Sequence, residues 1–197
     1  MAARDVFRVL NLRAPESFRS AGRRPGEQPD AWNLLLDFAY SLLFQRLNML
    51  IRLRGLDPYL GFLHSPQARY ESLVCDLQEP FRARCDRFVL KVVNRGQVTS
   101  TDFTTDPLTG LGLAPRAAAR FLEAYARELD TRLGNDLGTW GRLIEAQVLA
   151  VERWVCEGEP FRVFFAQPGL APRPPVIPEP APSDGVTPAP GTETGLG

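Results

Sequence analysis

Apolar side chains recur every three or four positions through most of the chain, and this spacing predicts an all-α fold. The longest such stretch runs from Asp30, a suitable helix N-cap, to Arg54, and Gly55 follows as a stop signal. Its expected buried stripe consists of Leu35, Phe38, Leu42, Leu43, Leu47 and Leu50. Alternation typical of a sheet is absent from the sequence, and at most one short strand is expected, at residues 97–101.

Further helical patterns cover residues 2–12, 68–93, 115–133 and 137–156, so a helical domain of about five to six helices is expected over residues 1–165. Pro80 lies inside the second of these patterns and should kink the helix, because proline has no N–H to donate. Residues 166–197 are rich in proline and poor in large apolar side chains. We expect a disordered tail there, since such a segment buries too little apolar surface to offset its ordering entropy.

Composition adds little evidence about partners. The 23 basic and 23 acidic side chains balance, so bulk charge predicts no nucleic-acid partner. The first 24 residues carry six arginines against two acidic residues, which indicates either a modest basic patch or an ordinary solvated surface. The three cysteines have no paired C-x-x-C spacing, which fits neither a disulfide framework nor a zinc site. With no apolar N-terminal leader, and with the apolar run Trp32–Phe44 too short for a membrane span, we expect a cytoplasmic protein without a membrane partner.

The candidate chemistry centres on His64, the only histidine. It lies between two helical patterns, and Asp76 and Glu79 follow on the second of them, on the same helix face as Arg69 and Ser72. An imidazole and two carboxylates near a helix kink are suited to a divalent cation. Two other interpretations stay open: a histidine with a structural hydrogen bond, and a solvated, ion-paired helix face. Spacing alone favours these over a metal site.

The same residues resemble a known family. The segments GLDPYLGFLH, SLVCDLQEPFR and DRFVLKVVNRG, followed by Asp102–Phe103, are similar in order and spacing to the helical domain of the CRISPR-associated endonuclease/integrase. The similarity continues upstream through GRRPGEQPDAWNLLLDFAYSLL and downstream through GLAPRAAARFLEAYARELDTRL and GRLIEAQVLAVERWV, so it covers roughly residues 1–165. That enzyme inserts new spacers into CRISPR arrays.

The resemblance implies a Mn²⁺ or Mg²⁺ site in which His64 and Glu79 are ligands and Asp76 acts as an outer-shell or substrate-side acid. All three would be catalytic residues. The family's third ligand, an early glutamate, maps at or just before Met1, and the family's β-rich N-terminal domain would precede it. We therefore expect this chain to be the C-terminal portion of such an enzyme, from a truncated or split gene or a misplaced start codon.

The implied partners are DNA (prespacer and CRISPR repeat), a second copy in a homodimer, and a second adaptation protein, a small nuclease-like subunit. The expected DNA-binding residues are Arg69, Arg82, Arg23 and Arg24, although Arg69 and Arg82 could pair with nearby carboxylates instead. Asn33 and Tyr40 match family positions and are interpreted as packing or orienting residues. Two alternatives stay open: a catalytically silent remnant that only binds DNA or adaptation partners, and a product without function.

Overall fold

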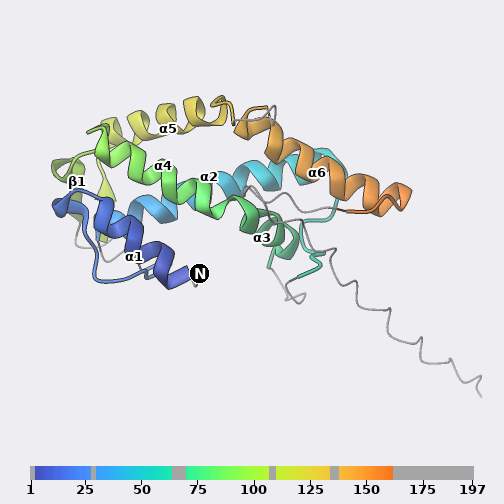
Figure 1. Ribbon diagram of the computed structural model, residues 1–197, viewed down its shortest axis with the longest axis horizontal. Coiled ribbons are helices and arrows are strands. Elements are labelled where there is room, and N and C mark those ends of the chain that lie inside the picture. Colours follow the sequence, from blue (N-terminus) through green and yellow to red (C-terminus); the bar gives the residue numbers. More distant parts are fainter. Residues whose placement is uncertain (1–2, 28–29, 64–69, 107–109, 134–137, 162–197) are drawn as a thin grey trace, which may run out of the picture.

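The protein is built around one long central helix, α2 (Ala31–Leu53), in a computed structural model that describes residues 3–27, 30–63, 70–106, 110–133 and 138–161. The other helices pack around α2, with α4 crossing it and α5 on the far side of α4 (Figure 1). They are α1 (Ala3–Arg13), α3 (Ser72–Gln78), α4 (Arg82–Asn94), α5 (Pro115–Leu129) and α6 (Trp140–Glu157), with 3-10 turns η1 (Glu16–Phe18), η2 (Glu79–Phe81) and η3 (Ser100–Asp102). The predicted all-α fold is confirmed.

The boundaries of α2 follow from local chemistry. The Asp30 side chain accepts a hydrogen bond from the Asn33 backbone N–H at 2.9 Å, as expected of an N-cap, and Gly55 ends the helix with a φ of 70°. Three leucines of the expected stripe are fully buried, and its other members are partly buried against the core. The fully buried set also includes Trp32, Ala39 and Ile51, because α2 packs against α3, α4 and α6 and so is covered on several sides.

Among the described residues, α2 is the one helix whose length and apolar composition would let it cross a membrane. The expectation that this stretch is too short for a span does not hold for the helix as a whole. Its central position in the packed helices requires the same apolar composition, so the composition is weak evidence for a membrane span.

Pro80 divides the expected helix 68–93 into two. Residues Glu79–Phe81 form a 3-10 turn between α3 and α4, and the Glu79 N–H still bonds the Cys75 carbonyl. The predicted kink is confirmed as a 3-10 turn that separates α3 from α4. Leu73 and Leu77, before this break, and Phe81, within it, are all buried.

The strand expected at residues 97–101 is wrong. The Gln97 N–H instead bonds the Val92 carbonyl, and Thr99 caps the turn Ser100–Asp102 through reciprocal hydrogen bonds with Asp102. The strands follow immediately: β1 (Phe103–Asp106) pairs antiparallel with β2 (Gly110–Leu113). The capping bonds satisfy the backbone locally, which removes the donors that a strand would need.

The last two helices are shorter than predicted. Helix α5 begins at Pro115 as expected but ends at Leu129 rather than residue 133, since Arg132 already pairs with Thr139 in an isolated bridge. Helix α6 begins at Trp140, where Thr139 is the N-cap, and ends at Gly158 with a φ of 70°. A chain of aromatic contacts joins these helices to the core, from Phe38 through Phe121, Phe88 and Tyr125 to Trp140. The expected tail, residues 166–197, lies outside the described residues.

Candidate functional site

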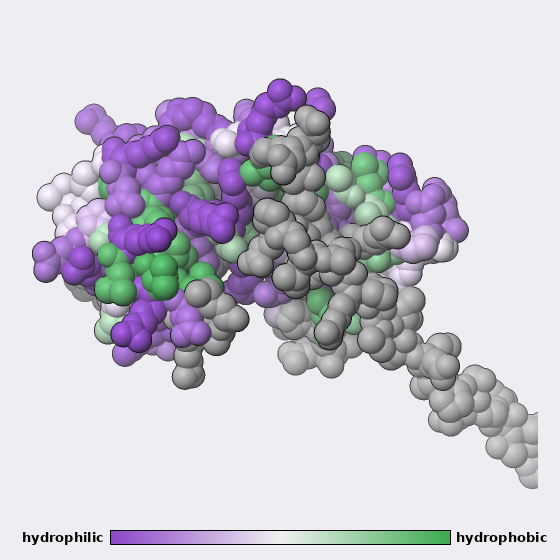
Figure 2. Space-filling view, viewed as in Figure 1, coloured by the Kyte–Doolittle hydropathy of each residue, from purple (hydrophilic) through white to green (hydrophobic). Residues whose placement is uncertain are grey.

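A pocket of about 860 Å³ opens between α1, the loop at residues 20–25, α2 and the η2–α4 segment. Val6, Phe7 and Leu10 of α1 supply its apolar wall. Hydrophobic side chains gather on the face of the molecule where α1 lies, with hydrophilic ones around them (Figure 2). The polar end of the pocket is lined by Arg23, Tyr40, Glu79, Arg82 and Asp86. The pocket therefore combines an apolar wall with a charged end that includes one predicted metal ligand.

Glu79 lies at the break between α3 and α4 with about half of its side chain exposed. Its Oε1 is 3.0 Å from Nη1 of Arg82, one helical turn further on. Because both partners are half exposed, such a pair contributes less than about 1 kcal/mol and opens at little cost. The carboxylate of Glu79 is thus available to a ligand that competes with Arg82.

Asp76 and Ser72 do not share this exposure, although the sequence places them on the same helix face as Glu79. Both are buried, and they face the loop at residues 57–63. Asp76 Oδ2 accepts hydrogen bonds from the backbone N–H groups of Phe62 at 2.6 Å and Leu63 at 2.9 Å. The expected shared helix face is therefore divided: Ser72 and Asp76 bond the loop at residues 57–63, and Glu79 lines the pocket.

His64 and Arg69 lie outside the described residues, so their roles stay predictions. The loop that leads to His64 is described as far as Leu63. Across the described part of the chain, no three His, Cys, Asp or Glu side chains come together in a group that could hold a metal ion. Glu79 alone among the predicted ligands can be assessed for fit, and its half-exposed carboxylate on a pocket is a suitable hard oxygen donor.

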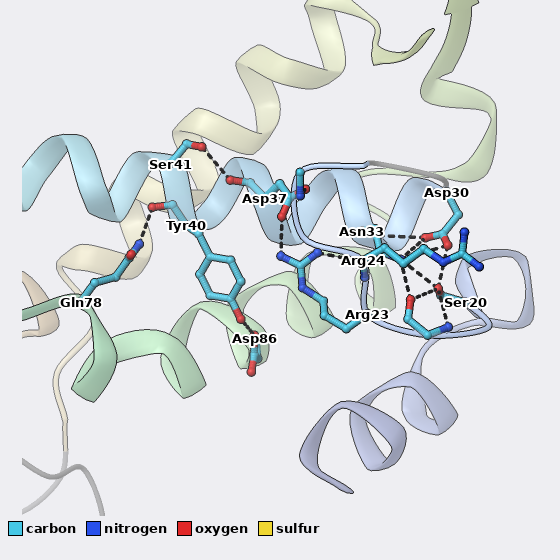
Figure 3. Close-up of polar contacts among 12 residues, drawn as sticks. Ser20, Arg23, Arg24, Asp30, Asn33, Asp37, Tyr40, Ser41, Gln78 and Asp86 are labelled. Atoms are coloured by element: carbon cyan, nitrogen blue, oxygen red, sulfur yellow. Dashed lines mark hydrogen bonds and ion pairs between the residues drawn. The ribbon is translucent and has the colours of Figure 1, made fainter. Parts of the chain in front are cut away.

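Tyr40 connects α2 to α4 at the polar end of the pocket (Figure 3). Its hydroxyl donates a hydrogen bond to Asp86 Oδ1, and its ring lies 4.8 Å from the Arg82 guanidinium and 5.5 Å from that of Arg23. Burial raises the pKa of Asp86, while the hydrogen bond from Tyr40 and the nearby arginines oppose that rise. The interpretation of Tyr40 as an orienting residue fits these contacts, because it holds Arg82 beside Glu79.

Asp86 did not figure in the sequence reasoning. It lies seven residues after Glu79, so the two share a helix face, and that spacing was the available signal. What spacing could not indicate was its partner Tyr40, which comes from α2.

Tyr40→Phe tests this hydrogen bond. The variant keeps the ring beneath Arg82 but leaves the partly buried Asp86 carboxylate without its hydroxyl donor, which should cost about 1–2 kcal/mol in the free energy of unfolding at neutral pH. The pKa of Asp86 should rise further, so the cost should shrink as the pH falls and the carboxyl becomes protonated in both folded and unfolded states. Urea unfolding between pH 3 and pH 7 and NMR titration of the Asp86 carboxyl measure both effects. The exposed Tyr59→Phe is the control, and equal stability of the two variants would contradict the assignment.

The two arginines of the loop at residues 20–25 differ in placement (Figure 3). Arg23 Nη1 donates to Asn33 Oδ1 at 2.9 Å and Nη2 pairs with Asp37, so its guanidinium is committed within the fold. The side chain of Arg24 is mostly exposed, and its pair with Glu27 is loose at 3.7 Å. Of these two predicted DNA contacts, Arg24 is the one whose side chain can reach a phosphate at little cost, because its one ion pair among the described residues is the loose, exposed one with Glu27.

Comparisons with known proteins identify the family of the chain and its fold. Residues 1–127 match the sequence profile of the family described as CRISPR associated protein Cas1. A relative from Haloferax volcanii, the CRISPR-associated endonuclease Cas1, is 32% identical over 163 residues, which is 80% of this chain and 48% of that protein. Two solved structures share the fold: a casposase bound to integration product (TM-score 0.68, 25% identity, 82% of this chain and 47% of that one) and a Cas6-RT-Cas1–Cas2 complex (TM-score 0.72, 22% identity, 84% and 19%). The chain thus spans about half or less of the length of these relatives. Since the family profile covers most of the helical domain, including Glu79 and the loop before His64, the chain belongs to the CRISPR-associated Cas1 family.

Proposed function

We propose that this chain is the helical part of a metal-dependent DNA endonuclease/integrase of CRISPR adaptation. The observation that carries the proposal is the position of Glu79: a carboxylate within the family match, half exposed on a pocket, and close in sequence to an anchored loop that leads to the single histidine. The Haloferax volcanii relative is named an endonuclease, and the casposase is bound to an integration product, so both support the same chemistry.

In this proposal Glu79 and His64 hold a Mn²⁺ or Mg²⁺ ion. When bound, such an ion polarises a phosphodiester and favours attack by water, in nicking, or by a DNA 3′-hydroxyl, in spacer joining. Arg82 supports the reaction from its place over the Tyr40 ring. When the Glu79 carboxylate binds the ion instead of Arg82, the Arg82 guanidinium can bind a phosphate oxygen at the same end of the pocket.

The proposed partners follow from the relatives. DNA, as prespacer and CRISPR repeat, would contact Arg82 and Arg24, whose side chains are substantially exposed, together with Arg69. We also propose a homodimer and a second adaptation protein as partners. A solved structure that shares this fold is part of a Cas6-RT-Cas1–Cas2 complex, which supports a second protein in the assembly.

His64→Ala and Glu79→Ala test the proposed function. With the full 197-residue chain, labelled branched DNA and Mn²⁺, each variant should reduce nicking or strand joining by at least about tenfold, because each removes a ligand of the ion. EDTA should abolish the activity of the unsubstituted chain.

Glu71→Ala is the matched control, since this carboxylate also lies on the α3 segment but bonds Asn48 and Arg52 instead of lining the pocket. Activity that survives undiminished in both test variants would eliminate the site. DNA binding that is unaffected by EDTA, without any cleavage, would favour the silent DNA-binding alternative.

A further inference from the structure

Glu79 and Arg82 are charge partners at the polar end of the pocket. Arg82 Nη1 donates to Glu79 Oε1 at 3.0 Å, and across the described part of the chain this is the one ion pair that either side chain makes. Burial lowers the pKa of the Arg82 guanidinium, but the charge of Glu79, the largest of the opposing causes, helps to raise that pKa above its ordinary value. Glu79 is therefore the main charged partner of Arg82.

Tyr40 holds Arg82 in place independently of Glu79. The guanidinium lies 4.8 Å from the centre of the Tyr40 ring, and the ring is fixed because its hydroxyl donates to Asp86 (Figure 3). A contact with the face of a ring uses the charge of a guanidinium but none of its N–H groups, so these can still donate to an oxygen. When the pair with Glu79 opens, Arg82 should thus stay at this end of the pocket with its donors available.

The charges around this pair do not favour a second anion. Two arginines, Arg23 and Arg82, lie among three carboxylates, Asp37, Glu79 and Asp86, so the acidic side chains outnumber the basic ones by one at neutral pH. A phosphodiester that approaches Arg82 therefore meets a guanidinium that is already paired and a carboxylate of its own sign. Loss of the Glu79 charge removes both obstacles at once.

We propose that the Glu79–Arg82 pair is an autoinhibitory contact, which withholds Arg82 from a DNA phosphodiester until another cation binds the Glu79 carboxylate. This inference deepens the proposed function and rests on it, because there the competing cation is the divalent ion. The ion and the DNA then strengthen each other's binding by the same factor, since each favours the open form of one contact. Arg82 is a conditional DNA contact, whereas Arg24 is available in both forms.

Glu79→Gln opens the contact without any ion. The substitution keeps the shape of the side chain and removes the charge that holds Arg82, and both side chains are about half exposed, so the fold should be retained. In EDTA, the affinity of the 197-residue chain for labelled branched DNA should rise by about three- to fivefold, because an exposed pair of this kind is weak. The slope of log affinity against log salt should steepen by about one, as expected for one added phosphate contact. Fluorescence anisotropy measures both.

Glu123→Gln is the matched control, since it removes the same charge from an exposed pair with Arg127 on α5. It should change the DNA affinity by less than about 1.5-fold. A double-mutant cycle with Arg82→Gln then separates the release of Arg82 from a plain loss of repulsion. In the Arg82→Gln background, Glu79→Gln should change the affinity by less than about 1.5-fold as well.

A rise in affinity that is equally large with and without Arg82 would overturn the proposal, because it would reflect only the loss of a negative charge. Equal affinities of Glu79→Gln and Glu123→Gln in EDTA would overturn it too. Failure of the proposed function has a different signature. Mn²⁺ would then strengthen DNA binding by the unsubstituted chain no more than by Glu79→Gln, while the measurements in EDTA would still show the rise that depends on Arg82.

Discussion

Glu128→Ala should destabilise the protein by about 3 kcal/mol or more, which is a large fraction of the stability of an ordinary domain. Glu128 lies on α5, is 5% exposed, and accepts from two cations of α4: Arg84 at 2.7 Å and Lys91 at 2.6 Å. Its removal leaves the two positive charges of α4, on the side packed against α5, without the carboxylate that they share. Urea unfolding followed by circular dichroism measures the free-energy difference.

Glu123→Ala is the matched control on the same helix. Glu123 and Arg127 are both exposed and 3.6 Å apart, so this substitution should cost no more than about 0.5 kcal/mol. A triple variant, Arg84→Met, Lys91→Met and Glu128→Leu, should recover much of the lost stability, because replacing a whole buried ionic network by apolar side chains is often neutral. Equal stability of Glu128→Ala and Glu123→Ala would contradict the importance of the network.

Asn33→Ala should cost about 3 kcal/mol. The Asn33 side chain is fully buried, its Nδ2 donates to the Gly22 carbonyl at 2.9 Å and its Oδ1 accepts from the Arg24 backbone N–H at 2.8 Å (Figure 3). It also bonds Ser20, Asp30 and Arg23. Alanine would remove the acceptor of the Arg24 N–H and one of the two donors to the Gly22 carbonyl, and it would open a cavity beside α2.

The loop at residues 20–25 lines the pocket that contains Glu79, so the loss of the Asn33 hydrogen bonds should also affect the backbone of this loop. Amide hydrogen exchange at residues 20–26 should increase along with the drop in unfolding free energy. Asn94→Ala is the control, because its side chain is exposed and makes one long bond of 3.4 Å to the Arg13 carbonyl. A cost below about 1 kcal/mol for Asn33→Ala would show that the loop is held by its other contacts.

Features that depend on neighbouring residues were predictable from the sequence. The N-cap at Asp30, the end of the helix at Gly55 and the break at Pro80 are each set by groups within four residues of one another, and each is confirmed. The strand at residues 97–101 failed for the same kind of reason, because the Thr99–Asp102 cap competes locally with strand pairing. The family resemblance, carried by Glu79 and its surroundings, was also readable from residue order, and the family match confirms it.

The tertiary structure decided what each helix face meets. Ser72, Asp76 and Glu79 share a spacing, but a loop from residues 57–63 covers the first two and leaves the third on the pocket. Tyr40 and Asp86 are 46 positions apart and meet only because α2 and α4 pack together. Periodicity specifies which side chains point the same way, since a helix repeats every 3.6 residues, but the partner on that side depends on how distant elements cross. The sequence by itself thus determined the helices and the family, and the packing of those helices decided which polar side chains hold the fold together and which remain open to a ligand.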